Sequence, residues 1–397
     1  MKLSSRIQSM QESPIRKLVP YSLQAAKEGK KIYHLNIGQP DIETPESFMN
    51  SIREFDAKTI AYAHSAGDFN LIDAVIKYFE RLDIHFERED IIVTNGGSEA
   101  LQFAIVATCD YDDELLVPEP FYTNYNGFSM PFGTKIKPIT TSPDDGFRLP
   151  SLEDMEKLIT EKTRGIMLSN PGNPTGAVYT KEEIERVSEL AVKHDLYIIA
   201  DEVYREFTYG TKAVSFATVD KAKDNVIIVD SISKRFSACG ARIGFIASKN
   251  KELMRNVMKL AQSRLCVPTL EMIGARSLYE LDESYFEPIK QEYQKRRDIL
   301  VESLQAMEGV FLEVPQGAFY AIAKLPVDNA EDFAIWLLKE FSYEDETVML
   351  APAEGFYATE GLGTTEVRIA YVLKSEDLKR AMDLLARALK EYPGRTN

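Results

Sequence analysis

The feature that most constrains the fold is an alternation of short, continuous apolar runs with longer amphipathic stretches. A strand without polar alternation must be buried on both faces, which is typical of parallel sheets covered by helices. We therefore predict an α/β fold with a mostly parallel sheet between layers of helices. The runs expected to form its strands are Ile91–Thr94, Leu115–Val117, Gly165–Ser169, Leu196–Ala200, Val226–Val229 and Ile243–Ile246.

The stretches between these runs carry helix signals. A helical pattern extends from Ser98 to about Thr108. Thr180 and Glu183 have the spacing of a capping box, which predicts a helix that begins there and ends near His194.

The pattern changes after a long helical region near residues 270–306. We predict a large domain over residues 46–285 and a smaller α+β domain over residues 286–397. Residues 1–45 are expected to join the smaller domain or a partner subunit. Within the smaller domain, strands are expected at 311–314, 319–323 and 367–372, and helices near 330–342 and 375–391.

Composition argues against several classes of partner. The net charge of −15 disfavours nucleic acid, because neutralising phosphates requires a basic face. The three cysteines are far apart and odd in number, so no disulfide framework is implied, and the four histidines show no metal-ligand spacing. No segment is long and apolar enough to span a bilayer. We expect no metal, nucleic-acid or membrane partner, and a reducing, cytoplasmic compartment.

Polar residues at the strand ends are candidate site residues, because ligands of such sheets bind beyond the carboxyl ends of the strands. Gly97 and Ser98 follow the first run and open a helix, whose free N–H groups suit a phosphate, although a Gly-Gly pair is also common in tight turns. Tyr122 follows the second run, where an aromatic ring either stacks on a planar cofactor or fills the core.

Two later strand ends carry further candidates. Asn173 lies in the turn Asn170–Gly176 and could donate to a ring oxygen, although Asn-Pro turns are common in any protein. Asp201 follows the most apolar run, where a carboxylate is costly unless it is paired. A protonated pyridine nitrogen would be a suitable partner, and Tyr204 could reach the same ring. The alternative for Asp201 is a helix N-cap.

Lys234 lies in a run with Ser231 and Ser233 before it and Arg242 eight residues after it. Its amine could form a Schiff base with a carbonyl cofactor, while the hydroxyls and the guanidinium hold that cofactor's phosphate. With 47 lysines and arginines in the chain, a solvated surface lysine is the alternative.

Taken in order, these segments resemble the class I/II aminotransferases, which are pyridoxal-phosphate enzymes of fold type I in the aspartate aminotransferase superfamily. The resemblance extends from about Leu35 to the C-terminus and implies a seven-stranded sheet in a cofactor-binding large domain. The segments that carry it are Thr94–Ala100, Tyr122, Asn170–Gly176, Asp201–Tyr204, Ser231–Lys234, Arg242 and Val367–Ile369.

The resemblance implies a role for each cofactor-binding candidate. Lys234 would hold pyridoxal 5′-phosphate as a Schiff base and later move the substrate Cα proton. Asp201 would keep the pyridine nitrogen protonated, and Tyr122 would stack on the ring. The phenolic oxygen would accept hydrogen bonds from Asn173 and Tyr204. The phosphate would be surrounded by Gly97, Ser98, Ser231, Ser233 and Arg242.

Other residues are implied to bind substrate or to join two subunits. Arg368 would clamp the substrate α-carboxylate with its planar fork, with the Gly38 N–H and Asn173 nearby. Tyr62 is similar to a family tyrosine that reaches a phosphate in the neighbouring subunit, which implies a homodimer with shared active sites. Arg264 is a candidate for binding the side chain of aspartate or glutamate near the partner's site.

The function implied is a transaminase with ping-pong kinetics that passes an amino group from an L-amino acid to a 2-oxo acid. We expect aspartate as the donor and 2-oxoglutarate as the acceptor, with aromatic or other amino acids as further donors. The alternatives are another enzyme of the same fold, such as a C–S lyase, a cyclopropane synthase or a decarboxylase, and a catalytically silent relative.

Overall fold

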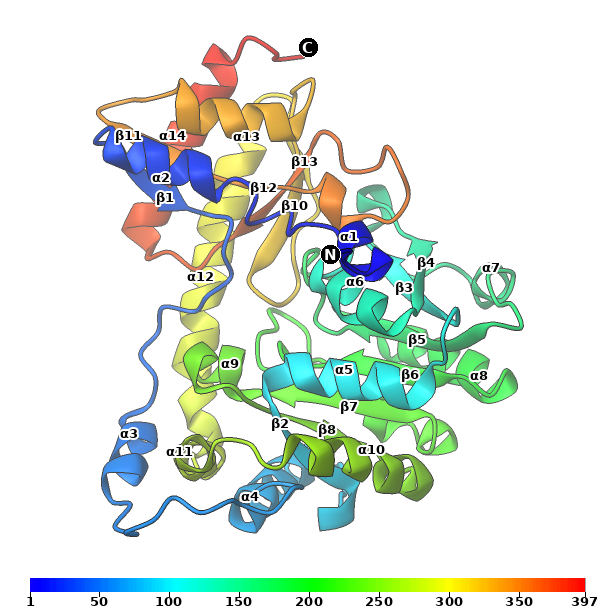
Figure 1. The fold of residues 1–397 in the computed structure, drawn as a ribbon. Helices are drawn as coiled ribbons and strands as arrows, with labels where there is room; N and C mark the ends of the chain where they lie inside the picture. Colours follow the sequence, from blue (N-terminus) through cyan, green and yellow to red (C-terminus); the bar gives the residue numbers. More distant parts are fainter. Residues whose placement is uncertain (397) are drawn as a thin grey trace.

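The computed structural model describes residues 1–396, and for Ser9 the main chain alone. Within these residues a central sheet of seven strands lies in the lower half of the view in Figure 1. Its strands, in spatial order, are β2 (Ile91–Asn95), β8 (Ile243–Ala247), β7 (Val226–Ser231), β6 (Tyr197–Asp201), β5 (Thr163–Ser169), β3 (Glu114–Glu119) and β4 (Lys135–Thr140).

The predicted α/β fold and its mostly parallel sheet are confirmed. Every predicted apolar run overlaps one of these strands, and β8 alone among the described strands of this sheet runs antiparallel to its neighbours β7 and β2. All residues of β7 and β8 are buried, so layers of structure cover both faces of the sheet there.

Strand β4 is missing from the sequence prediction. It forms one edge of the sheet beside β3 and contains Lys135, Lys137 and Pro138, none of which is buried. Charged residues and proline are typical of edge strands, where one side of the backbone needs no ladder partner. A search for continuous apolar runs therefore passes over it.

Helices connect the strands and flank the sheet. In Figure 1, α5 and α10 lie in front of it. The predicted capping box is confirmed at the start of α8, where the side chains of Thr180 and Glu183 each accept a main-chain N–H. The helices of this region are α3 (Glu46–Arg53), α4 (Phe69–Glu80), α5 (Gly96–Thr108), α6 (Asn124–Ser129), α7 (Leu152–Glu156), α8 (Lys181–Lys193), α9 (Ile232–Arg235), α10 (Lys251–Arg264) and α11 (Thr269–Tyr279).

The helical region predicted near 270–306 consists of two helices, α11 and α12. A turn at residues 280–285 separates α11 from α12, and the side chain of Asp282 caps that turn by accepting the Ser284 N–H. The long α12 leads from the central sheet into the upper half of Figure 1. The helices that follow the turn are α12 (Phe286–Gln305), α13 (Ala330–Lys339) and α14 (Ser375–Glu391).

The C-terminal part contains two smaller sheets. The strand predicted at 311–314 is only Phe311–Leu312. The strand predicted at 319–323 shifts by one residue, and the one predicted at 367–372 begins one residue earlier and ends two residues earlier. Two short strands, β1 and β11, were missed because they pair with each other across most of the chain, which no local pattern reveals. The strands are β12 (Ala351–Pro352), β13 (Glu366–Ala370), β10 (Tyr320–Lys324) and β9 (Phe311–Leu312) in one sheet, and β1 (Lys31–His34) and β11 (Glu346–Met349) in the other.

The N-terminal segment connects the two halves of the molecule. Helix α1 (Ser5–Ser9) lies beside α6, and α2 (Val19–Lys27) packs on α13 in Figure 1. Leu18, just before α2, is buried against Ala334 and Leu338 of α13. Across residues 1–396, no helix combines the length and the apolar character needed to cross a bilayer.

Candidate active site

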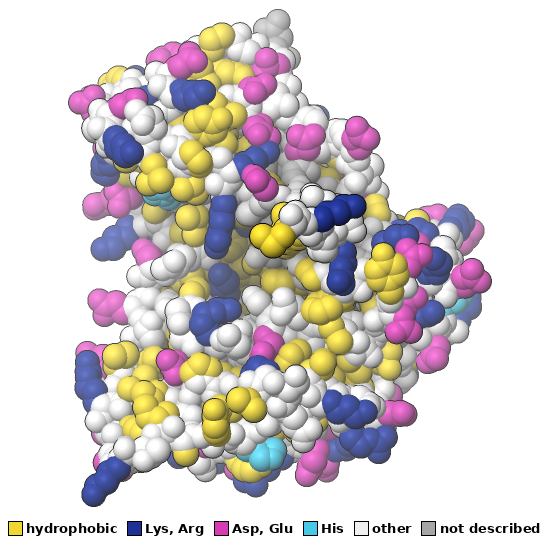
Figure 2. Space-filling view, viewed as in Figure 1, with side chains coloured by type: hydrophobic (Ala, Val, Ile, Leu, Met, Phe, Trp, Pro, Cys, Tyr) yellow, Lys and Arg dark blue, Asp and Glu magenta, His cyan; other side chains and the backbone are white. Residues whose placement is uncertain are grey.

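A cavity of about 350 Å³ lies between the carboxyl ends of the central strands, the C-terminal sheet and the N-terminal segment. Figure 2 shows a hollow with basic side chains at the middle of this face of the molecule. The cavity brings together most of the candidates from the sequence: Gly38, Gly97, Ser98, Tyr122, Asn173, Asp201, Tyr204, Ser231, Ser233, Lys234, Arg242 and Arg368.

Strand register explains why distant candidates meet. Asp201 ends β6 and lies in register with Ser169 at the end of β5, while Ser231 ends β7. The short helix α9 begins directly after Ser231 and places Lys234 over the strand ends. The Lys234 Nζ donates to the main-chain oxygen of Gly38 at 3.0 Å, which joins the N-terminal segment to the sheet.

The start of α5 forms a cradle suited to a phosphate. Gly96 has φ of +74°, and a Cβ there would lie 2.4 Å from Nη2 of Arg242. The first N–H groups of a helix have no main-chain acceptors, and Gly97 and Ser98 at the start of α5 line the same cavity as Arg242. Ser231 completes this side of the cavity. The structure thus places a helix N-terminus, a guanidinium and a serine around one part of the cavity, a combination that suits a phosphate group.

Asp201 is a buried carboxylate at the base of the cavity. It accepts a hydrogen bond from Tyr125 Oη at 3.0 Å and another from the Val203 N–H at 3.4 Å. A turn rather than a helix follows Asp201, so the N-cap alternative considered from the sequence is wrong. Burial raises the pKa of Asp201 to about 7, against the lowering effect of the two hydrogen bonds. In residues 1–396 no cation lies within ion-pair distance of it, which suits a ligand that brings its own proton or positive charge.

Two hydrogen-bonded tyrosines, Tyr204 and Tyr320, form part of the cavity wall. Tyr204 and Tyr320 share a hydrogen bond of 2.9 Å between their hydroxyls, and Tyr320 also donates to the Gly38 carbonyl at 3.4 Å. A Cβ on Gly38 would lie 1.8 Å from the Tyr320 hydroxyl, so only glycine fits there. Tyr320 was not a sequence candidate, although its strand was predicted, because no pattern showed which face of that strand meets the site.

Arg368 is a buried cation without an anionic partner. Its Nη1 donates to Asn173 Oδ1 at 3.2 Å and its Nη2 to the Asn36 carbonyl at 2.5 Å. The guanidinium stacks between the rings of Tyr320 and Phe356, at 4.6 and 5.1 Å. No carboxylate in the described chain pairs with it, its Nε has no acceptor, and burial lowers its pKa. A ligand carboxylate would complete this group, and the Asn173 amide nitrogen is left to donate.

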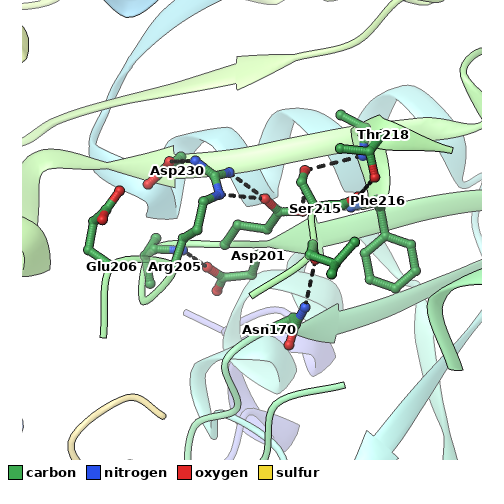
Figure 3. Close-up of polar contacts among 12 residues, drawn as sticks. Asn170, Asp201, Arg205, Glu206, Ser215, Phe216, Thr218 and Asp230 are labelled. Atoms are coloured by element: carbon green, nitrogen blue, oxygen red, sulfur yellow. Dashed lines mark hydrogen bonds and ion pairs between the residues drawn. The ribbon is translucent and has the colours of Figure 1, made fainter. Parts of the chain in front are cut away.

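A buried ionic network underlies the lysine turn and was missed in the sequence. Asp230 pairs with Arg235, the residue after Lys234, and lies 3.3 Å from Nη1 of Arg205. Arg205 also pairs with Glu202, whose other oxygen accepts from Ser215 and from the Phe216 N–H, and Figure 3 shows Arg205 beside Asp230 with Ser215 nearby. Four adjacent charges with almost no solvent exposure hold the ends of β6 and β7 together.

Two sequence candidates do not line the cavity of this single chain. Tyr62 is 81% exposed, in the segment before α4. Arg264, at the end of α10, lies 3.3 Å from the Glu99 carboxylate and donates to the Val93 carbonyl at 2.9 Å. The cavity instead includes residues that the sequence had not indicated, among them Ser13, Ile15, Arg16 and Val19 of the N-terminal segment.

Comparisons with known proteins identify the family to which the chain belongs. The sequence model of the family described as aminotransferase class I and II matches residues 30–385. The chain is 31% identical to aromatic-amino-acid aminotransferase 2 of Thermococcus litoralis, over 98% of this chain and 99% of that protein.

Solved structures show the same similarity. The aspartate aminotransferase from Thermus thermophilus with maleate superposes with a TM-score of 0.88 at 30% identity, over 98% of this chain and all of that one. The alanine aminotransferase from Pyrococcus furiosus gives 0.90 at 29% identity, with the same shares. A family match over most of the chain and full-length similarity at this level establish that the chain belongs to the class I and II aminotransferases, with the fold of the type I pyridoxal-phosphate enzymes.

Proposed function

We propose that this aminotransferase moves the amino group of an L-amino acid to 2-oxoglutarate with pyridoxal 5′-phosphate as cofactor, and that aspartate is its first donor. The observation that carries the proposal is that Lys234 lines one cavity together with the buried carboxylate of Asp201 and the guanidinium of Arg368, which has no anionic partner among the described residues. The names of the relatives support an amino-acid substrate but differ in the donor, which is aspartate, alanine or an aromatic amino acid.

The residues present fit the cofactor at both of its ends. The cradle of Gly97, Ser98, Ser231 and Arg242, with Ser233 beside it, suits a phosphate, since a Cβ on neighbouring Gly96 would collide with the Arg242 guanidinium. Asp201 suits a protonated ring nitrogen, because its burial is not matched by a cation of the chain. When bound, the cofactor would supply an electrophilic carbon and a ring that accepts electrons from the substrate Cα.

The chain's own groups would perform binding and proton transfer. Arg368 and the Gly38 N–H would hold the substrate α-carboxylate, with the Asn173 amide nearby, which orients the Cα–H bond toward Lys234. The Lys234 amine would then remove the Cα proton and return it at the neighbouring carbon. Tyr122 would cover the ring, and Tyr204 would donate to its phenolic oxygen. The donor's oxo acid would leave before the acceptor binds, so one site serves both half-reactions.

The proposal includes a homodimer with shared sites. The high exposure of Tyr62 supports a role across a subunit boundary, and Arg264 would lie near the partner's site with its charge already paired to Glu99. It also includes the division into residues 1–45, 46–285 and 286–397. Two separate clusters of buried apolar side chains, one ending at Phe286 and one dominated by later residues, support that division. A cytoplasmic location stays a prediction.

The decisive experiment follows the cofactor and the products together. The purified holoenzyme should show a visible cofactor band that single amino acids bleach, and borohydride should fix the cofactor covalently to wild-type protein but not to Lys234→Ala. Oxo-acid formation from aspartate with matching glutamate production would support transamination. Release of ammonia with pyruvate would identify a lyase instead, and a protein without a cofactor band would refute the proposal.

A further inference from the structure

The turn that precedes α2 is held firmly at the cavity. The Ser13 carbonyl accepts the N–H groups of Arg16 and Lys17 at 3.0 and 3.1 Å. On one side, Pro14 is buried and lies so close to Gly355 that a Cβ added to Gly355 would collide with it. On the other side, Leu18 is only 1% exposed and packs against α13. Because both flanks are fixed, the main chain between them is held beside the cavity by tertiary structure rather than lying in a flexible tail.

Arg16 is the charged residue of this turn that lines the cavity. Its side chain is exposed, and in residues 1–396 no carboxylate lies within ion-pair distance of it. The next residue, Lys17, is also exposed but pairs with Glu331 of α13 and does not line the cavity. Two adjacent cations thus point to different surroundings, and only Arg16 of the two has an unneutralised charge facing the site.

The balance of charge in the cavity leaves Arg16 without a task in the proposed reaction. The lining residues contain one carboxylate, Asp201, and four cations. In the proposed function Lys234 binds the cofactor, Arg242 its phosphate and Arg368 the substrate α-carboxylate. The fourth cation at the same cavity, Arg16, is therefore available to an acidic group on the part of the substrate beyond its α-carboxylate.

Arg16 and Arg368 are connected through one apolar cluster. Ile15 packs on the cluster that contains Phe356, and the Phe356 ring lies 5.1 Å from the Arg368 guanidinium. Both arginines also line the same cavity, as would suit a ligand with an acidic group at each end. The neutral side chains of Ser13, Gln39 and Asn124 also line the cavity and could donate further hydrogen bonds.

We infer that Arg16 binds the distal carboxylate of dicarboxylic substrates, amino acids and oxo acids alike, and so sets the substrate class of this enzyme. The inference rests on the proposed function, and it assigns within a single chain the role considered above for Arg264. The planar guanidinium can hold a carboxylate through two parallel hydrogen bonds. Arg264 is less suited, because Glu99 already neutralises it outside the cavity.

The test uses the holoenzyme and two matched variants, Arg16→Gln and Lys17→Gln, which remove one adjacent positive charge each. Succinate, an unreactive dicarboxylate, and butyrate, its monocarboxylate counterpart, are titrated by calorimetry. Arg16→Gln should weaken succinate binding about tenfold to a hundredfold, since a charge-assisted hydrogen-bonded pair is lost, and leave butyrate unchanged. Lys17→Gln should leave both unchanged. In turnover, Arg16→Gln should raise KM for aspartate by a similar factor, with little change for alanine.

The outcomes separate this inference from the proposed function. Unchanged succinate affinity in Arg16→Gln, or equal weakening in Arg16→Gln and Lys17→Gln, would overturn it, as would a selective loss in Arg264→Gln with Arg16→Gln intact. If succinate binding depends on Arg16 but no amino acid yields an oxo acid, the proposed transamination fails while the assignment of Arg16 stands.

Discussion

Asp230 and Arg235 form an ion pair with no exposed side-chain surface, and Lys234 lies beside it in the sequence. The other oxygen of Asp230 accepts the Ser231 N–H at 2.7 Å, so the same carboxylate fixes both ends of the turn that carries the lysine. Its negative charge also raises the pKa of Asp201. A structural ion pair thus positions one candidate catalytic group and influences another.

Replacing one partner of this pair should cost much stability. Asp230→Asn leaves Arg235 as an uncompensated buried charge, which typically costs about 3–5 kcal/mol of unfolding free energy. Arg276→Gln is the control, because it breaks an exposed helical pair with Glu280 that is worth only about 0.3–0.5 kcal/mol. Urea unfolding measures both. Similar small losses in the two variants would contradict the importance of the buried pair.

The cofactor-free protein should lose stability as pH rises from about 4 to about 7. The folded-state pKa of Asp201 is raised to about 7, so the folded protein retains a proton that the unfolded chain releases near its usual pKa of about 3.9. The contribution of this group falls by about 1.4 kcal/mol per pH unit over that window and is constant above it.

Asp201→Asn isolates this effect, because asparagine does not titrate. The variant should show a smaller decline of unfolding free energy between pH 4 and 7, and at pH 8 it should be more stable than wild type while losing activity. Chemical denaturation across the pH range checks this. Parallel pH profiles for the two proteins would show that Asp201 does not hold a proton in the folded chain.

A methyl group at Gly38 should disrupt the wall of the site. The added Cβ would lie 1.8 Å from the Tyr320 hydroxyl, and overpacking of this kind typically costs about 1–3 kcal/mol. Gly240→Ala is a nearby control, since a Cβ there meets nothing within 4 Å. Gly38→Ala combined with Tyr320→Ala should recover part of the lost thermal stability. A double variant no better than the sum of its parts would argue against the collision.

Arg368→Met should separate stability from substrate binding. The guanidinium is buried without an anion, so an apolar side chain of similar length should leave the cofactor-free protein equally or more stable. Substrate affinity should fall by about 2 kcal/mol or more, roughly 30-fold, because the α-carboxylate loses its partner. Thermal unfolding and KM measure the two effects. A less stable variant with unchanged KM would place Arg368 in a purely structural role.

Much of the site could be predicted because its parts follow strands. Asn173, Asp201 and Lys234 come just after apolar runs, and the carboxyl ends of parallel strands meet at one edge of a sheet. The resemblance in sequence added Gly38 and Arg368 from outside that sheet, and the cavity contains both. The prediction was weaker for short strands such as β1 and β11, whose pairing joins residues more than 300 positions apart.

The sequence by itself determined the fold class and the chemical groups at the strand ends, because burial of continuous apolar runs and the polarity that follows them are local properties of the chain. Only the tertiary structure decided which charges are paired. Arg235 and Arg264 have carboxylate partners, while Arg368 and Arg16 have none among the described residues. An arginine has the same local signature in each case, and its role depends on whether folding places a carboxylate within its reach.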